Sequence, residues 1–428
     1  MFPADVLIVG GGIQGLVLLD DLTRQGYACV LVTAADLGSG QTLHSHGLLN
    51  SGTALLTGEL QDPLRAALSF ARQRGLQLYG EDSWYALVPP AAFQQLLAGW
   101  AGSNYEYREL RRADLPPGFR EGDLFRQRTP THVIGLKGYN FPKRQLVRLL
   151  SETQTQRVIG GNIAAFHRSV EQGTVRIDSV DIRLQATGEV VAISPQAVIA
   201  AAGTGTKRLL KSIVASPSGQ LARVTYTRTH MICIRAPRGV LPATSIASLP
   251  HGLISVAHEN HDHDHVGHDA GDSVTWYVTP AEDAVHHEDA PDTARAEVSR
   301  EVVAQGMRKL LNLYTALTSA AADAGSQVRF GVFAGYKQNV GDQPTVPMCE
   351  PVDGTGNVFM ALPSVFINAW SNAQTLLRLL DSRVPASGPP IVVPGAGLGV
   401  RVGAANELTD EVTWKPLAEF VRAFPGIL

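Results

Sequence analysis

Six residues near the start of the chain have the types and spacing that bind a dinucleotide. The run Gly10-Gly11-Gly12-Ile13-Gln14-Gly15 is a GxGxxG motif. Its first glycine allows a tight turn, its second lets the backbone approach a pyrophosphate, and its third lets a helix pack closely on a strand. The helix N-terminus offers N–H groups and a positive dipole to the phosphates. We expect the phosphates to contact Gly10, Gly12, Ile13, Gln14 and Gly15.

The ribose position of this motif is unusual. Such motifs place Asp or Glu about 20 residues downstream, and here Thr33 occupies that position, followed by Ala34 and Asp36. The hydroxyl of Thr33 or the carboxylate of Asp36 can bond a ribose. No Arg or Lys occurs from Val30 to Leu43, which argues against a 2′-phosphate and hence against NADP. From this loop alone, both FAD and NAD remain open.

The elements around the motif predict a βαβ unit. Val6–Val9 is a short apolar run before the glycines, a helix with an apolar face follows, and Ala28–Val32 is a second apolar strand. Similar strand-to-helix units begin at Ala197–Ala202 and at Val358–Leu362. Buried parallel strands joined by crossover helices predict an α/β sheet with its ligand at the carboxyl ends of the strands.

Alternating apolar and polar residues between these units predict a second domain. Arg223–Ile234 and Ser273–Val278 show this pattern, which is typical of antiparallel strands. At 428 residues the chain is long enough for two or three domains. The predicted fold is a Rossmann-like nucleotide-binding domain interleaved with a mostly antiparallel β-sheet substrate domain. The predicted limits are 1–75, 136–215 and 326–385 for the first domain, 76–135 and 216–325 for the second, and 386–428 for a C-terminal tether and helix.

Composition excludes several classes of partner. Lys and Arg number 36 against 39 Asp and Glu, so no basic excess is available for nucleic acid or an anionic membrane. Cys29, Cys233 and Cys349 are widely spaced, which disfavours disulfides and a thiolate metal site and fits a reducing cytoplasm. No signal peptide or transmembrane run is evident. We expect a cytoplasmic protein that binds small molecules and no metal.

The segment after the second strand carries a family resemblance. Residues 36–52 read DLGSGQTLHSHGLLNSG. This segment resembles FAD-dependent oxidoreductases of the D-amino-acid oxidase, glycine oxidase and glycerol-3-phosphate dehydrogenase superfamily. It is most similar to the HQTGHNSGVIHSG pattern of L-2-hydroxyglutarate oxidase, and the run 197–203 is similar to the family's VVxAAG strand. The matching residues of the pattern are Gln41, Thr42, His44, Gly47, Ser51 and Gly52.

The resemblance implies FAD as the cofactor and a set of residues around it. In the family the segment runs along the FAD pyrophosphate and beneath the isoalloxazine ring. The implied contacts, in addition to the motif and the ribose position, are Ser39, Gln41, Thr42, His46, Gly47, Leu48, Ala202, Gly203, Asn368 and Ala369.

The resemblance weakens at the substrate end. The family's GxRP sequence corresponds here to Gly335-Tyr336-Lys337-Gln338, so lysine replaces an arginine that pairs with a substrate carboxylate in many members. Arg228 falls on the arginine of the family's RGxY strand. We expect Asn50, Arg228, Tyr336 and Lys337 to contact substrate.

The chemistry implied is hydride transfer from a substrate carbon to the flavin. For an alcohol, His44 and His46 are candidate bases, and Lys337 completes the candidate catalytic set, whereas a neutral amine needs no base. The acceptor of the electrons is O₂ or another molecule. We predict an FAD-dependent oxidoreductase that oxidises a CH–NH or CH–OH centre of a small, carboxylate-bearing metabolite. The alternatives are a flavin-binding protein without oxidase turnover and an NADPH-dependent flavin monooxygenase.

A His- and Asp-rich stretch at 258–269 has the residue types of metal ligands. It lies between two alternating runs, where a long hairpin loop is expected. An alternating HxHxH run has no single tetrahedral geometry. We predict a mobile, solvated loop that begins at His258.

Overall fold

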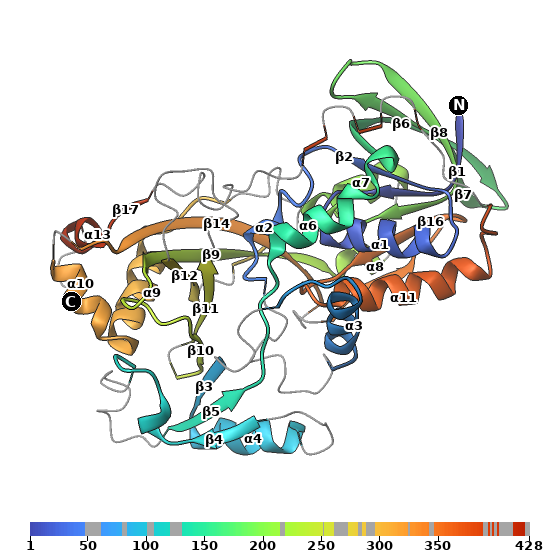
Figure 1. Ribbon diagram of the computed structural model, residues 1–428. Coiled ribbons are helices and arrows are strands. Elements are labelled where there is room, and N and C mark those ends of the chain that lie inside the picture. Colours follow the sequence, from blue (N-terminus) through green and yellow to red (C-terminus); the bar gives the residue numbers. More distant parts are fainter. Residues whose placement is uncertain are drawn as a thin grey trace.

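The computed structural model contains two large sheets joined by long crossing segments (Figure 1). The described parts of the chain are 1–47, 61–78, 84–100, 107–119, 131–214, 219–250, 252–260, 273–280, 285–287, 296–323, 326–341, 346–387, 393, 396–397, 400–401 and 414–423.

The first sheet has seven strands and carries the glycine motif. Its parallel strands pair in the order β6-β2-β1-β8-β16. β7 pairs antiparallel with both β6 and β8, and β15 pairs antiparallel with β16 at the edge. The strands are β1 (Phe2–Val9), β2 (Cys29–Thr33), β6 (Val158–Glu171), β7 (Thr174–Leu184), β8 (Val190–Ala200), β15 (Met348–Pro351) and β16 (Val358–Leu362).

Helices cover one face of this sheet, and β7 with a short helix covers the other. Apolar side chains of the first group bury β1 and β2 in one continuous core, while Leu210 and Ile213 of α7 pack on the opposite face. Both faces are therefore buried, which explains why the central strands are almost wholly apolar. The first group is α1 (Ile13–Arg24), α3 (Gln61–Gln73), α6 (Lys143–Glu152) and α11 (Asn368–Asp381); the short elements after β8 are η4 (Gly203–Gly205), α7 (Thr206–Ile213) and α8 (Gly219–Ala222).

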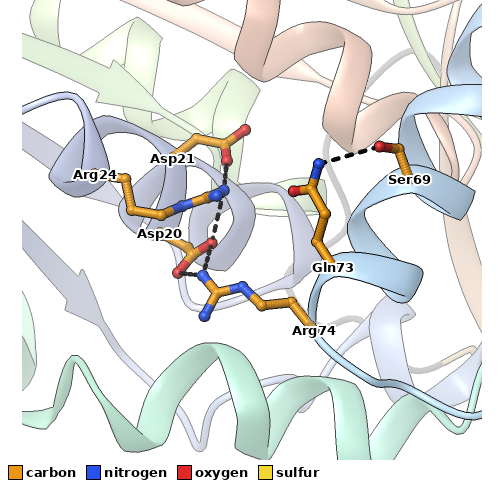
Figure 2. A network of polar contacts seen from close by, with 6 residues as sticks. All are labelled: Asp20, Asp21, Arg24, Ser69, Gln73 and Arg74. Atoms are coloured by element: carbon orange, nitrogen blue, oxygen red, sulfur yellow. Dashed lines mark hydrogen bonds and ion pairs between the residues drawn. The ribbon is translucent and has the colours of Figure 1, made fainter.

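A network of charged side chains fastens the end of α3 to α1 (Figure 2). Asp20 is 3% exposed, and its carboxylate binds the guanidinium of Arg74, with Arg24 3.1 Å away. Arg24 also pairs with Asp21. A buried carboxylate requires such partners, because an unpaired buried charge is costly. The network therefore sets where the chain returns after the cofactor loop.

The second sheet has ten strands, and its centre is antiparallel. Nine strands follow the order β17-β14-β9-β12-β11-β10-β3-β5-β4, and β13 pairs with β9. The strands are β3 (Trp84–Val88), β4 (Tyr107–Leu110), β5 (His132–Leu136), β9 (Val224–Pro237), β10 (Ser245–Ser248), β11 (Leu253–Asn260), β12 (Ser273–Pro280), β13 (Val285–His287), β14 (Arg329–Val340) and β17 (Lys415–Pro416).

One face of the second sheet packs on helices, and the other faces the cofactor loop. Ile232, Ile234 and Trp276 pack against the helix that carries Met307. β3, β4 and β5 form the outer end of the sheet together with α4 (Figure 1). The helices are α4 (Pro90–Trp100), α9 (Arg300–Leu313), α10 (Ala316–Ala322) and α13 (Leu417–Ala423); a short helix α2 (Gln41–His44) and two turns, η2 (Arg112–Asp114) and η3 (Thr155–Arg157), complete the set.

The predicted strand types agree with this architecture. The three strand-to-helix units lie in the parallel sheet, and the alternating runs form β9 and β12, which pair antiparallel. One segment differs from the predicted division: β14 belongs to the ten-stranded sheet, although it falls in the range 326–385 assigned to the nucleotide-binding domain. The domain limits as a whole remain a prediction. None of the helices in the described ranges is both long and apolar enough to span a bilayer.

Candidate functional site

The glycine motif forms a tight crossing of β1, α1 and β8. Gly10 has a φ of +128°, and a Cβ there would collide with the carbonyl group of Ala201. A Cβ on Gly15 would collide with the carbonyl oxygen of Gly10. These two positions tolerate only glycine, for the close approaches that the motif predicts.

The N-terminus of α1 suits an anionic group. Its N-cap is Gly12, which contributes no side chain, and its first turn contains no acidic residue. The helix dipole is therefore not neutralised there by the protein. Thr42 accepts a hydrogen bond from the Ile13 amide at 2.8 Å and brings the cofactor loop against this terminus. A pyrophosphate fits this environment.

Other predicted cofactor residues converge on the same place. The Gly38 amide donates to the Gly11 carbonyl at 2.8 Å. The Gln41 side chain lies 3.8 Å from the position of a Cβ on Gly203, so α2 and the end of β8 are neighbours. Ser39 lies between Gly38 and Gln41 in sequence, and a Cβ on Gly10 would lie 2.8 Å from Cα of Ala202, in addition to its collision with Ala201. The structure thus brings together loop segments that are about 160 residues apart in sequence.

At the ribose end, the Thr33 hydroxyl donates to the carbonyl of Ala35 at 2.6 Å. The Ala34 carbonyl accepts a bond from the Gln185 side chain at 2.7 Å. Asp36 is partly buried beside them. Since the Thr33 hydroxyl already has a local acceptor, Asp36 is the better candidate for a ribose contact. The Leu37 amide donates to the carbonyl of Arg401, so the C-terminal segment also reaches this end, which the sequence did not indicate.

The side chain of Gln14 is hydrogen-bonded to two residues of α11. Its amide donates to the Ala369 carbonyl at 3.2 Å and accepts from Asn372 at 2.8 Å. The side chain is buried. Gln14 therefore ties α1 to the start of α11, and only its main chain remains available to a phosphate. Asn368 is fully buried at that helix start.

The substrate end lies on the face of the second sheet that α9 does not cover. Directly opposed residues of an antiparallel pair share a face. Phe333 opposes Met231, Lys337 opposes Thr227, and Cys233 opposes Tyr277. These side chains therefore point to the same side as Thr279, whose hydroxyl lies 3.5 Å from the sulfur of Met231.

The turn after α2 is held against this face by its histidines. His44 Nδ1 is 2.5 Å from the Gly40 carbonyl, and its ring packs edge-on against Phe333. His46 Nε2 is 2.7 Å from the Thr279 hydroxyl. Burial, with the charges of Lys143 and Lys337 nearby, lowers the pKa of His46 to about 3. The His46 imidazole is therefore neutral and a weak base.

Of the predicted substrate residues, Lys337 lies on this face of the sheet, whereas Arg228 and Tyr336 do not. Burial lowers the pKa of Lys337 to about 8, and its charge is close enough to act on His46. Arg228 and Tyr336 oppose each other one residue out of phase with Lys337, so they point to the other face. Their predicted role gains no support from this geometry. Leu48 and Asn50 lie outside the described residues.

Sequence reasoning missed His258. It was predicted to begin a solvated loop, but it lies within β11 opposite Thr275. Its ring nitrogen Nε2 is 2.7 Å from the His46 carbonyl, and its ring packs edge-on against Tyr277. The prediction was wrong because strand pairing with β12 extends to Asn260. Residues 261–269 lie outside the described residues. Among the residues that are described, no cluster of His, Cys, Asp or Glu could hold a metal ion.

Sequence reasoning also missed Lys143, the first residue of α6. Its ammonium donates to the carbonyls of Leu43 (2.8 Å) and Ser45. It also lies 5.0 Å from the centre of the Tyr277 ring. The apolar periodicity of α6 carried no signal for this role, because the partners are about a hundred residues away.

Comparisons with known proteins support the same interpretation. Residues 5–362 match the model of the FAD dependent oxidoreductase (DAO) family. A probable FAD-dependent oxidoreductase of Pseudomonas aeruginosa is 28% identical over 253 residues, which cover 54% of this chain and 58% of that relative. The chain thus aligns with less than two thirds of that relative's sequence.

Solved structures share the fold. The structure of the Pseudomonas aeruginosa oxidoreductase superposes with a TM-score of 0.65 at 20% identity, covering 96% of this chain and 99% of that one. Glycine oxidase from Geobacillus kaustophilus gives 0.64 at 15% identity, covering 93% and 99%. L-amino acid deaminase from Proteus vulgaris gives 0.63 at 14% identity, covering 93% and 97%. These likenesses confirm the predicted fold class.

The family match extends over most of the chain and includes the glycine motif and every strand of the second sheet except β17. It confirms FAD, rather than NAD, as the cofactor that the dinucleotide motif left open. The chain belongs to the DAO family of FAD-dependent oxidoreductases.

Proposed function

We propose that this protein oxidises the carbon–nitrogen bond of a small amine that carries a carboxylate. The observation that carries the proposal is the state of His46, whose neutral ring bonds Thr279 and whose pKa is about 3. Oxidation of an alcohol requires a base for the hydroxyl proton. A neutral amine donates its hydride without one, so this weak base favours the amine.

When bound, FAD accepts the hydride from the substrate carbon. In our proposal Gly10, Gly12, Gln41, Thr42 and Gly203 hold it near the start of α1. The sheet face with Phe333, Met231 and Tyr277 supplies an apolar wall for the substrate. The wall excludes water and strengthens electrostatic contacts within the site.

Lys337 is the proposed anchor for the substrate carboxylate. It is partly buried, and its pKa of about 8 leaves it mostly protonated at neutral pH. A lysine ammonium binds a carboxylate as a point charge, without the paired geometry of an arginine. We therefore expect tolerance of different carboxylate orientations.

The names of two structural relatives agree with an amine substrate. One is a glycine oxidase and another an L-amino acid deaminase. His44 provides the specific case for the second candidate, a 2-hydroxy acid. Its Nδ1 faces a carbonyl, which makes Nε2 the acceptor nitrogen of the ring. His44 would be the base in that reaction.

The test is anaerobic reduction of the FAD-loaded protein by matched substrate pairs. Glycine with glycolate and alanine with lactate are the matched pairs of amine and hydroxy acid. Proline and N-methylglycine are added as secondary amines, and reduction is read as loss of the flavin absorbance band. Bleaching by the amines alone supports the proposal, and bleaching by the hydroxy acids alone contradicts it. Bleaching by NADPH without substrate would indicate a monooxygenase. No bleaching by any compound would favour a flavin protein without turnover.

The electron acceptor is identified in the same experiment. After substrate reduction, air is admitted and reoxidation is followed together with peroxide formation. Rapid reoxidation with peroxide identifies O₂ as the acceptor. Slow reoxidation that a quinone or another dye accelerates identifies a dehydrogenase. A cytoplasmic location remains a prediction.

A further inference from the structure

The turn His44–Gly47 is held from several sides by residues of distant elements. The Phe141 amide donates to the Gly47 carbonyl at 2.8 Å, and His258 contacts the His46 carbonyl. Gly47 has a φ of +66°, and a Cβ there would lie 2.7 Å from Cγ of Lys143. The lysine stem therefore fills the space beneath this glycine.

Lys143 occupies an unfavourable position for the fold. It is 8% exposed and lies at the first turn of α6, where the helix dipole repels a cation. Burial lowers its pKa to about 7. Because this value lies below the ordinary 10.5, the unfolded chain binds the extra proton between about pH 7 and 10.5, and stability rises with pH across that window. At neutral pH the buried charge therefore costs stability.

The polar surroundings of Lys143 nevertheless suit a charged group. Two carbonyls and the face of Tyr277 match its three N–H donors. A cation that opposes the stability of its fold and is fully coordinated beneath a site is typical of a functional residue.

We propose that Lys143 is a positioning residue of the flavin site: it fastens the turn His44–Gly47 to α6 and places a positive charge close to His46 and His258. The inference rests on the site proposed above. It assigns to Lys143 no contact with substrate.

The charge of Lys143 affects the pKa values of two neighbouring histidines. Desolvation is the main cause that lowers the pKa of His46 and of His258 to about 3, and Lys143 is the largest charge contribution to both. His46 also faces His258 and Lys337, while Lys143 also faces Cys233 and Arg144. Removing the charge of Lys143 raises the pKa of both rings, because one repelling cation is lost.

The test is NMR titration of histidine rings in FAD-loaded protein, with signals assigned by His46→Asn and His258→Asn. The titration covers pH 3 to 8, and in the native protein both midpoints lie near pH 3. In Lys143→Met both midpoints rise by about one pH unit or more, to about pH 4 or above. Lys143→Arg keeps the charge and should preserve the native titration.

Lys207→Met is the matched control. Lys207 is also 8% exposed and donates to a main-chain carbonyl, that of Val224, at 3.2 Å. It should leave both rings unchanged. If Lys143→Met does not fold, Lys143→Gln replaces it, since the amide can still donate to one carbonyl. Identical titrations in the native protein and the neutral variants would overturn the proposal.

The readout does not depend on turnover. If the histidine titrations shift as expected but no amine reduces the flavin, the proposed function fails and the role of Lys143 stands. If amines reduce the flavin and the titrations do not shift, the reverse holds.

Discussion

The nucleotide end of the site is built from main-chain atoms, whereas the substrate end is built from side chains that several elements bring to one face of the second sheet. At the nucleotide end, glycines let β1, α1 and β8 approach within van der Waals distance. At the substrate end, Lys143, His46 and His258 meet from three elements. At the nucleotide end the close backbone contacts restrict which residue can stand at each position. At the substrate end several residue types can serve, because binding depends on the surface that the side chains form together.

The two ends therefore differ in how well they tolerate substitution. A glycine that crosses a neighbouring backbone has no substitute, so the nucleotide end keeps its motif. A charged side chain on a strand can be exchanged for another that reaches the same space, as Lys337 in place of the family's arginine illustrates.

The largest effect is expected from Gly15→Ala. The added Cβ collides with the carbonyl of Gly10, which must separate α1 from β1. We expect FAD affinity to fall at least about 100-fold, near 3 kcal/mol, from overpacking. Titration of apoprotein with FAD, followed by flavin fluorescence, measures it. Gly219→Ala is the control, because in the described part of the chain no atom outside its own helix and its sequence neighbours lies within 4 Å of its Cβ. Equal FAD affinities for the two variants would contradict the claim that the nucleotide end restricts residue type.

Lys337→Met tests the substrate end. Loss of a buried carboxylate anchor should lower kcat/KM for a carboxylate-bearing amine by about 30-fold, near 2 kcal/mol, mostly through KM. FAD affinity should not change. The exposed Lys415→Met serves as control, with unchanged kinetics. A variant that loses FAD and keeps KM would mean that Lys337 belongs to the nucleotide end.

Arg74→Met tests the network that places α3 (Figure 2). Among the described residues Asp20 then keeps only Arg24 as an ionic partner, so we expect a loss of about 1.5 kcal/mol in unfolding free energy. Chemical denaturation with matched m-values measures it. Arg65→Met removes an exposed pair with Asp62 and should cost about 0.5 kcal/mol or less. A larger loss in Arg65→Met than in Arg74→Met would contradict the role of burial.

The smallest effect is a pH dependence of substrate capture. The pKa of Lys337 is about 8, and only its protonated form attracts a carboxylate. As pH rises through 8 the anchor loses its charge, whereas the neutral form of the substrate amine becomes more abundant with either protein. The ratio of kcat/KM in the native protein to kcat/KM in Lys337→Met cancels the titration of the amine, and it should fall about fourfold between pH 7 and 8.5. A ratio that stays constant across this range would mean that Lys337 is not the anchor.

Much of the fold could be predicted from local patterns. The glycine motif, the apolar strands and the alternating runs correspond to β1, α1, β2, β8, β9, β12 and β16. Each depends on the conformation or burial of neighbouring residues. The end of β11 was misjudged, because pairing with β12 overrides the loop-like composition that begins at His258.

The glycine motif could be predicted from the sequence and, through the family resemblance, so could the cofactor. Its tight turn, its helix terminus and the contact of Gly15 with Gly10 lie within six residues, whereas the contact of Gly10 with Ala201 depends on tertiary structure. Tertiary structure alone decided the substrate end. His46 meets Thr279 across 233 residues, and Lys143 meets Leu43 across 100. Strand register decided which face Lys337 and Arg228 occupy. Register depends on pairing between distant strands, and a shift of one residue exchanges the faces.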